Sequence, residues 1–247
     1  MFTYIYGYHP VLMALEKNSL IKIKKVFLIE NKHQKVLAEL KKSKVTFEYI
    51  SLEKMNNLLQ TTKHQNICAQ IASYHYFNLS EILNIIPKNK FYRFLICDKI
   101  TDPHNFGSIL RIAAGNDFDC VIVLNRNQAE LNGIVVKAAA GAVSVIKICQ
   151  VNNLSQIINF LQQKNFWILA ADKNDQAQDY QNLKYDHHLA LIIGNEGHGI
   201  SNNILRKADY LVTIPMSDKI ESFNASVACG IIANNIYLKS KKINTKK

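Results

Sequence analysis

The sequence contains few cysteines, and their arrangement matches neither a disulfide framework nor a metal site. Cysteine occurs five times in 247 residues, at widely separated positions, and no pair has the Cys-x-x-Cys spacing. Several cysteines lie in apolar runs such as FLIC and CVIVL, which is typical of reduced thiols in a protein core. The only adjacent histidines, His187 and His188, lack partners at ligand spacing. We therefore expect no metal site.

Long apolar segments and one common nucleotide-binding motif are also missing. The first ten residues do not place a basic region before an apolar one, and the uncharged stretch 222–238 is interrupted by three asparagines and two serines. These patterns argue against a signal peptide and a membrane span, so we expect a soluble, cytoplasmic protein. The sequence Gly-Lys-Ser/Thr is absent, which excludes a Walker-type phosphate loop.

Arginine is absent from the first ninety residues, although that part of the chain is strongly basic. It holds 13 lysines against 6 glutamates and contributes most of the formal net charge of +11. A basic excess favours a polyanionic partner such as nucleic acid, because each neutralised phosphate releases counterions. Many basic proteins nevertheless bind nothing in particular.

Glycine is nearly absent from the same part, which predicts a division into domains. Residues 1–90 contain only Gly7, and the other eight glycines lie between Gly107 and Gly230. Alternating helix and strand patterns predict a compact α/β domain over 1–76 and a linker over 77–90, with a short helix at LSEILNII. The second domain then spans 91–247, of which 240–247 is a basic tail that we expect to be solvated and disordered.

The second domain contains near-continuous apolar runs separated by segments with helical spacing. The runs are FLIC, CVIVL, VSVIKI, FWILAA, LALIIG and YLVTIP. Such runs are typical of strands that are buried on both faces, which predicts a mostly parallel sheet in an α/β fold. Ligands of these sheets bind beyond the carboxyl ends of the strands, so the loops after Cys97, Ile193 and Ile214 are the candidate site.

The first loop leads into an apolar helix that carries one arginine. Asn105 is a good N-cap, and Arg111 follows six residues later within ILRIAAG. In one interpretation the helix is simply capped and Arg111 extends to the surface. In the other, Asn105 and Arg111 face a substrate anion.

The second and third loops are rich in glycine and in small polar residues. Three glycines within 194–199 allow close approach to the backbone, although Glu196 in their midst would repel a pyrophosphate. The segment 214–226 gathers Ser222, Asn224 and Ser226 at the start of a helix, which capping alone could explain. His198 is interpreted as an exposed loop residue and not as a base.

Taken in order, the three loops resemble the motifs of the SpoU (TrmH) family of RNA ribose 2′-O-methyltransferases. The motifs read D-x-x-x-D-P-x-N-x-G-x-x-x-R, then G-N-E-G-x-G-I-S, then I-P-M-x-x-x-I-x-S-F-N-A-S-V-A, and the resemblance covers 91–240. The opening Y-I-Y-G-x-H-P-V-x-x-A-L-E is similar to a ribosomal-protein-like RNA-binding domain. That domain is carried by the subfamily that methylates a guanosine of 23S ribosomal RNA.

This resemblance implies a fold, a cofactor and a partner. The expected fold is a parallel α/β sheet with a C-terminal deep trefoil knot, and the expected cofactor is S-adenosylmethionine. By position, cofactor contacts fall on Gly194, Ile214, Met216 and Phe223. Family members pair through the knotted domain and build the active site from both chains, so we expect a homodimer. The candidate apolar face consists of Val227, Ile231 and Ile236.

The resemblance also assigns catalytic roles. Arg111 would hold a phosphate and stabilise the developing alkoxide, a better role than base because the pKa of a guanidinium lies above ~12. Asn105 would orient the ribose, and Glu196 would fix Arg111 or the loop. The pocket would be completed by Ser222 and Asn224.

Three positions depart from the family pattern, and two alternative functions stay open. Asp218 and Asn66 replace glycines, Phe223 replaces a leucine, and Asp218 would strain its loop if its φ were positive. A tRNA guanosine 2′-O-methyltransferase of the same family typically lacks the N-terminal domain. A non-catalytic RNA-binding protein of this fold would be expected to have lost Arg111 or Gly194.

Overall fold

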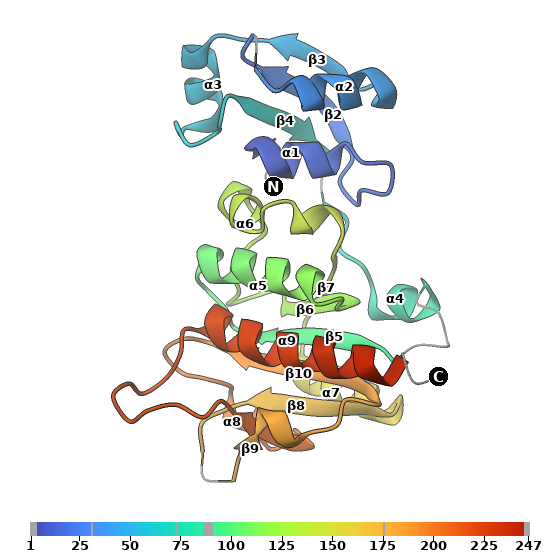
Figure 1. Cartoon of the computed structure of the whole chain (residues 1–247), viewed down its shortest axis with the longest axis vertical. Helices are drawn as coiled ribbons and strands as arrows, with labels where there is room; N and C mark the ends of the chain where they lie inside the picture. Colours follow the sequence, from blue (N-terminus) through green and yellow to red (C-terminus); the bar gives the residue numbers. More distant parts are fainter. Residues whose placement is uncertain (1–3, 31, 73, 86–90, 175, 245–247) are drawn as a thin grey trace.

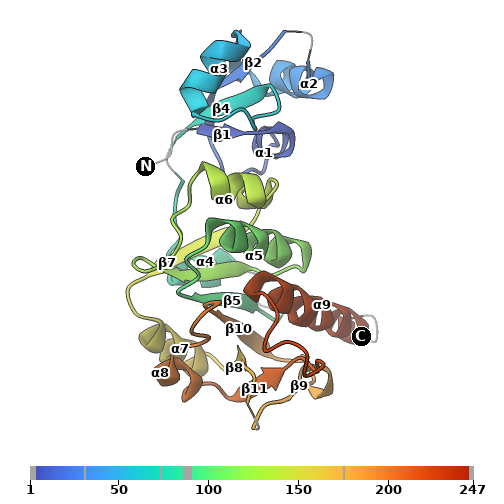
Figure 2. The ribbon, with the colours of Figure 1, turned by 90° about the vertical axis from the view of Figure 1, so that its left-hand side faces the viewer.

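The chain forms two lobes, each built around its own β-sheet (Figure 1). The computed structural model describes residues 4–30, 32–72, 74–85, 91–174 and 176–244. The N-terminal sheet has four strands in the order β1-β4-β2-β3, and the C-terminal sheet has seven in the order β7-β6-β5-β10-β8-β11-β9. Both views show the N-terminal lobe stacked end to end on the C-terminal lobe, with α6 between the two sheets (Figure 2).

The N-terminal lobe is a mixed sheet with helices on both of its faces. Its elements are β1 (Tyr4–Tyr6), α1 (Tyr8–Ala14), β2 (Ile23–Leu28), α2 (Gln34–Ser43), β3 (Thr46–Tyr49), α3 (Leu52–Leu59) and β4 (Ile67–Ile71). Val26 and Leu28, two residues apart on β2, point to one face and are buried together with Val36 and Leu40 of α2. Met55 of α3 is buried against the opposite face. β3 is an edge strand that pairs in parallel with β2.

The C-terminal lobe is a wholly parallel sheet. Its strands are β5 (Arg93–Asp98), β6 (Cys120–Leu124), β7 (Lys147–Val151), β8 (Phe166–Ala171), β9 (Gln178–Asp179), β10 (His188–Gly194) and β11 (Tyr210–Thr213), and each pairing is parallel. Five of the apolar runs coincide with strands β5, β6, β8, β10 and β11. The run VSVIKI, at 143–148, overlaps β7 only at Lys147 and Ile148, because its first residues belong to the 3-10 helix η1 (Ala142–Ser144). β9 is only two residues long, and β1 is only three, so neither produces a readable period in the sequence.

Helices cover both faces of the parallel sheet, which explains its continuous apolar runs. The elements are α4 (Leu79–Ile85), α5 (Pro103–Gly115), α6 (Gly133–Ala138), η1 (Ala142–Ser144), α7 (Leu154–Gln163), η2 (Tyr180–Asn182), α8 (Asn202–Leu205) and α9 (Ala225–Asn244). Residues of α5, α6 and α9 belong to one buried cluster, and residues of α4 and α7 belong to the other. On α9, Ile236 is fully buried, so it is not part of an exposed apolar face.

Much of the segment expected to be a linker packs on the C-terminal lobe. The amide of Phe77 donates to the carbonyl oxygen of Ile148 at 2.9 Å, and Leu79 and Ile82 of α4 are buried. Their apolar side chains, spaced as in an amphipathic helix, were available to cover the sheet face beside β7. The polar break at 87–90 lies outside the described residues.

The basic tail is also more ordered than its composition predicts. α9 continues to Asn244, so the expectation of a disordered end is wrong over 240–244, and residues 245–247 lie outside the described residues. The ammonium of Lys239 donates to the carbonyl oxygens of Gln181 and Leu183. Lys239 therefore contacts the η2 segment and is not a free charge.

The two lobes are joined by hydrogen bonds and packing contacts, which we call the seam, as well as by the connecting chain. The amide of Leu20 donates to the carbonyl oxygen of Ser144 at 2.8 Å. The ammonium of Lys137 donates to the carbonyl oxygen of Lys63 at 2.7 Å. Gly141 has a φ of 96°, and a Cβ there would lie 2.2 Å from the sulfur of Met13. The positive φ and the contact with Met13 both favour glycine at this point of the seam.

Candidate active site

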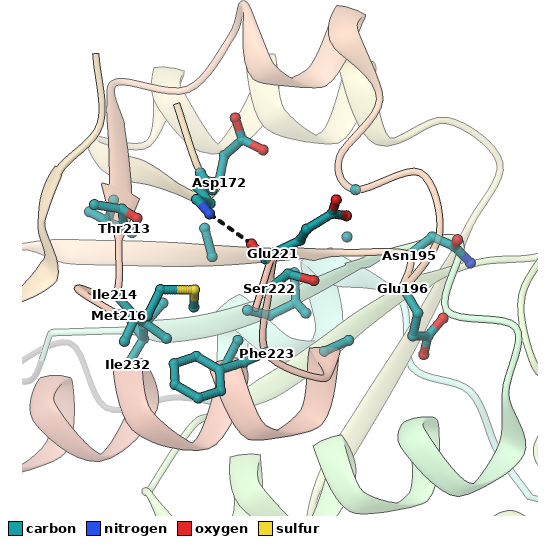
Figure 3. A pocket seen from close by; sticks show the side chains of 18 of the residues that line it. Asp172, Asn195, Glu196, Thr213, Ile214, Met216, Glu221, Ser222, Phe223 and Ile232 are labelled. Atoms are coloured by element: carbon teal, nitrogen blue, oxygen red, sulfur yellow. Dashed lines mark hydrogen bonds between the residues drawn. The ribbon is translucent and has the colours of Figure 1, made fainter. Parts of the chain in front are cut away.

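The second and third loops meet at the carboxyl edge of the parallel sheet and line one cavity, together with the loop after β8. None of the described residues that line it belongs to the first loop. The cavity has a volume of about 370 Å³, and its lining includes residues from the ends of β8, β10 and β11 and from the segment before α9 (Figure 3). The predicted site residues that line it are Gly194, Glu196, Ile214, Met216, Ser222 and Phe223. Ile214, Met216 and Ile232 lie at one end of the cavity, and Glu196 lies at the other (Figure 3).

The second loop folds back on itself immediately after β10. Asn195 and Gly199 exchange two backbone hydrogen bonds of 3.0 and 2.8 Å, and the side-chain oxygen of Asn195 accepts from the amides of Gly197 and His198. A Cβ on Gly194 would lie 2.3 Å from the carbonyl carbon of Gly199. Glycine is therefore required at 194 by the loop's own backbone, a reason that the sequence pattern did not reveal.

The first and second loops are tied together at their bases. The carboxylate of Asp98, buried at the end of β5, accepts from the amide of Ser201 at 2.8 Å. The ammonium of Lys99 donates to the hydroxyl of Ser201 at 3.1 Å, and the side chain of Asn195 donates to the carbonyl oxygen of Lys99 at 2.9 Å. These bonds fix the turn that presents Glu196.

Asn105 is a buried polar residue at the centre of the site and not a helix cap. The N-cap is Asp102, whose carboxylate accepts from the amide of His104, and α5 begins at Pro103, so the prediction of Asn105 as N-cap is wrong. The side chain of Asn105 donates to Glu196 at 2.5 Å and accepts from that of Asn224 at 3.0 Å. One residue from each motif is thus joined in a single hydrogen-bonded chain.

Asn224 has a second function at the start of α9. Its side-chain oxygen accepts from the amide and the hydroxyl of Ser226, at 2.9 and 2.7 Å. Its amide group is left to donate to Asn105. Capping and site assembly, which the sequence left as alternatives for this cluster, are therefore performed by opposite ends of the same side chain.

Arg111 lies apart from this chain of hydrogen bonds. Its side chain is exposed on α5, and within the described residues it neither lines the cavity nor has a hydrogen-bond or ion-pair partner. Glu196, which the resemblance placed near Arg111 or the loop, contacts Asn105 instead. An unpaired, exposed guanidinium remains available to an anion from outside the chain.

The sequence missed two acidic residues and one lysine that line the same cavity. Asp172 and Lys173 follow β8, and Glu221 lies before Ser222. The ammonium of Lys173 donates to the carbonyl oxygen of Glu221 at 3.0 Å (Figure 3), which ties the loop after β8 to the third loop. No motif marks Asp172 or Lys173, although the end of a buried parallel strand is where ligands are expected.

The departures from the family pattern cause no visible strain. Asp218 does not have a positive φ, so the expected strain is absent there. Asn66 has a φ of 62°, a conformation that asparagine tolerates better than most residues, which explains how it can replace glycine. All five cysteines are buried free thiols.

Two further findings concern the described residues as a group. They contain no cluster of three or more histidine, cysteine or acidic side chains suited to a metal ion. None of the helices they form has both the length and the apolar character needed to cross a bilayer.

Comparison with known proteins matches both lobes to families. Residues 92–234 match the SpoU rRNA Methylase family, and residues 4–77 match the domain described as RNA 2′-O ribose methyltransferase substrate binding. YacO of Bacillus subtilis, named as a TrmH family tRNA/rRNA methyltransferase, is 31% identical over 245 residues, which is 97% of each chain.

Solved structures share the fold at low identity. The SpoU methyltransferase AviRb from Streptomyces viridochromogenes, in complex with AdoMet, aligns with a TM-score of 0.80 at 19% identity and covers 98% of this chain and 90% of its own. The A. aeolicus TrmH/SpoU tRNA modifying enzyme aligns with a TM-score of 0.58 at 23% identity, and covers 67% of this chain and 84% of its own.

The geometry and the comparisons agree. The second and third motifs line one cavity, the first motif is joined to both by the hydrogen bonds of Asn105, and the family match extends over most of the chain. The chain belongs to the SpoU (TrmH) family of S-adenosylmethionine-dependent RNA methyltransferases.

Proposed function

We propose that this enzyme methylates the ribose 2′-hydroxyl of a guanosine in 23S ribosomal RNA. The observation that carries this proposal is the chain of hydrogen bonds that runs from Glu196, which lines one end of the cavity, through Asn105 to Asn224. A polar group oriented in this way beside a cofactor site can hold a ribose for attack on a methyl group.

The cavity suits S-adenosylmethionine in size and in lining. At about 370 Å³ it falls within the range of small-molecule sites. Met216 and Phe223 provide apolar walls for adenine, and Gly194 also lines the cavity. The carboxylates of Asp172 and Glu221 favour a cationic ligand. We expect calorimetry to detect cofactor binding in EDTA, and a requirement for a divalent ion would contradict this assignment.

The chain's own residues must orient the ribose and manage its proton, since the sulfonium methyl is already a strong electrophile when the cofactor is bound. Asn105, held by Glu196, is positioned to bind the ribose, with Ser222 and Asn224 beside it. Arg111, which has no partner in the described part of the chain, holds the adjacent phosphate and stabilises the developing alkoxide.

We propose that the C-terminal segment forms the trefoil knot of this family. Its loops are already fastened to one another, by Lys173 to Glu221 and by Asn105 to Asn224. α9 then packs on α5.

We also propose a homodimer in which α9 contributes to the contact. Val227 is 47% exposed and Ile231 is partly exposed on this helix. A second copy that covers this face would also bring a new set of groups toward the exposed Arg111 on the neighbouring α5. Sedimentation at micromolar concentration should give twice the mass of 28.1 kDa, and a fully active monomer would contradict the proposal.

Ribosomal RNA is favoured over transfer RNA by the N-terminal lobe. The tRNA modifying enzyme from A. aeolicus covers only 67% of this chain, whereas residues 4–77 match a substrate-binding domain. A non-catalytic RNA-binding role is disfavoured because Arg111, Glu196 and Gly194 are all present.

The substrate assignment is tested by mapping 2′-O-methyl sites in RNA from cells with and without this chain. We expect one guanosine of 23S ribosomal RNA to lose its methyl group. A change confined to transfer RNA would support the alternative enzyme, and no change in any RNA would contradict methyl transfer.

A further inference from the structure

The outer edge of the N-terminal sheet exposes aromatic side chains that no element of the chain covers. Phe47 and Tyr49 of β3 are 41% and 45% exposed, and Leu52 just beyond the strand is 53% exposed. Three of the ten large apolar side chains exposed by the described residues therefore fall within six consecutive positions. Exposed apolar groups gathered in this way usually mark a binding surface.

The two rings are arranged so that a further ring can stack on them. They lie on the same face of the edge strand, because they are two residues apart, with Glu48 on the other face. Their centroids are 5.6 Å apart and their planes meet at 80°. An edge-to-face pair leaves at least one face of each ring uncovered by the other.

Lysines surround this edge and outnumber its acidic groups, two of which are paired. Residues 22–54 contain nine lysines, four glutamates and no arginine. Glu48 is paired with Lys25 at 2.7 Å and with Lys54 at 3.4 Å, and Glu39 is paired with Lys42. The remaining exposed lysines include Lys24, Lys41 and Lys44. The surface therefore combines open rings with unpaired positive charge.

We propose that this edge, defined as Phe47 and Tyr49 with the lysines of 22–54, is a stacking platform for unpaired bases of the RNA substrate. The inference rests on the proposed function and adds to it a location and an RNA conformation. Aromatic faces stack on bases of any identity, so the platform prefers single-stranded RNA, whose bases are free to stack. Lysines neutralise phosphates but do not make bidentate hydrogen bonds to bases, so the platform has little sequence preference. A protein partner would not require this excess of lysine.

The position of the platform gives it a defined role. β3 lies at the end of the N-terminal lobe that is farthest from the C-terminal lobe (Figure 1). The contact of Gly141 with Met13 joins this lobe to the one that holds the candidate active site. A loop of RNA bound at the platform would therefore lie at the opposite end of the chain's long axis from the ribose that is to be methylated (Figure 1).

The test compares a variant that lacks both rings but keeps apolar side chains with a variant that keeps both rings. Full-length F47L/Y49L retains exposed apolar groups but has no aromatic face, whereas F47Y/Y49F retains both rings. The probes are a fluorescein-labelled twelve-nucleotide oligoadenylate and an RNA duplex of equal length. Because both positions are exposed on the surface, all of these variants should fold. V145S, at a position 48% exposed in the C-terminal lobe, is the control for loss of an exposed apolar group.

We expect F47L/Y49L to bind the single strand at least tenfold more weakly, because each stacked base contributes to affinity, while F47Y/Y49F and V145S bind like the wild type. Duplex binding should change little. Unchanged single-strand affinity in F47L/Y49L would overturn the proposal, as would an equal loss for the duplex. A dimer in the wild type that becomes a monomer in F47L/Y49L, as measured by sedimentation, would overturn it as well, because the edge would then be covered by a second copy.

A second readout separates this proposal from the proposed function. F47L/Y49L should raise the KM for ribosomal RNA while cofactor affinity and the rate at saturating RNA stay unchanged. If the wild type transfers methyl groups but F47L/Y49L has an unaltered KM, the platform is wrong and the enzyme assignment stands. If the wild type binds neither cofactor nor RNA, the proposed function itself fails.

Discussion

Asn105 and Glu196, 91 residues apart in the sequence, form a 2.5 Å hydrogen bond that joins the first loop of the site to the second. The donor is the amide group of Asn105, and its oxygen accepts from Asn224 on the third loop. Asn105 is only 8% exposed, whereas Glu196 and Asn224 are exposed, so loss of the Asn105 side chain removes two hydrogen bonds and opens both partners to water.

Substitution of Asn105 should therefore damage both catalysis and local stability. We expect N105A to lower kcat by about 100-fold or more, by analogy with the loss of one positioned donor, and to cost about 1–3 kcal/mol of unfolding free energy. Single-turnover kinetics and urea unfolding measure the two effects. N125A is a matched control, since Asn125 makes a similar 2.5 Å amide contact with Asn152 but is not bonded to Glu196 or Asn224. Normal turnover in N105A would contradict the role given to Asn105.

Gly194 and Gly197 should respond differently to the same substitution. A Cβ at 194 would meet the backbone of Gly199 at 2.3 Å, whereas a Cβ at 197 would meet only the side-chain oxygen of Asn195, at 3.5 Å. G194A should shift the loop and weaken S-adenosylmethionine binding at least tenfold, and G197A should change it little. Calorimetric titration of both variants with S-adenosylmethionine measures the difference. Equal affinities of G194A and G197A would contradict this prediction, because they would show that the loop accommodates a Cβ at 194.

Arg111 should affect chemistry and leave cofactor binding unchanged. Its side chain does not line the cavity, so R111A is expected to keep the affinity of the wild type for S-adenosylmethionine. Methyl transfer should be abolished in R111A, and R111K should keep only a small fraction of the wild-type activity. The ammonium of lysine is a point charge and cannot reproduce the bidentate hydrogen bonds of a planar guanidinium to phosphate. A lysine variant with near wild-type turnover would remove the argument for bidentate phosphate binding.

His64 should make the N-terminal lobe less stable in mild acid. Its ring is buried, its Nδ1 accepts from the amide of Asn66, and its Nε2 lies 2.8 Å from the side-chain oxygen of Asn56. Burial, assisted by the charge of Lys137, lowers its pKa below the usual 6.5. Below about pH 6.5 the unfolded chain binds a proton at His64 that the folded chain does not bind. The free energy of unfolding is therefore unaffected by His64 above that pH and decreases as the pH falls below it.

The loss from this one group cannot exceed about 1.4 kcal/mol per pH unit. Urea unfolding at pH 7.5 and 5.5 measures it, with the exposed His75 changed to glutamine as a control and His64→Gln expected to flatten the dependence. A direct titration of His64 by NMR provides a second measurement. A midpoint at or above 6.5 would be inconsistent with burial of the neutral ring.

The parallel sheet and the location of the site could be predicted because both depend on local signals. Buried strands read as apolar runs, and their loops must meet at one edge, which brought Gly194, Met216 and Phe223 to one cavity as expected. The partner of Asn105 could not be predicted, because capping and tertiary hydrogen bonding require the same residue type. Asp102 is the N-cap because the helix already begins at Pro103.

Other features depend on packing that leaves no periodic pattern. α4 was recognised as a helix, but the short apolar segment did not indicate which surface it would cover. The reason for glycine at 194 lies in the backbone of Gly199 and not in a ligand. Similarly, Phe47 and Tyr49 read as ordinary strand residues, and only the edge position of β3 shows that they stay uncovered.

The most direct measurement is the identity of the methylated nucleoside made by the purified chain. Deproteinised ribosomal RNA and transfer RNA from cells lacking the gene are each incubated with tritiated S-adenosylmethionine and digested to nucleosides. The account predicts label in 2′-O-methylguanosine from 23S ribosomal RNA, and none in R111A. Label on a base, or in transfer RNA alone, would contradict it.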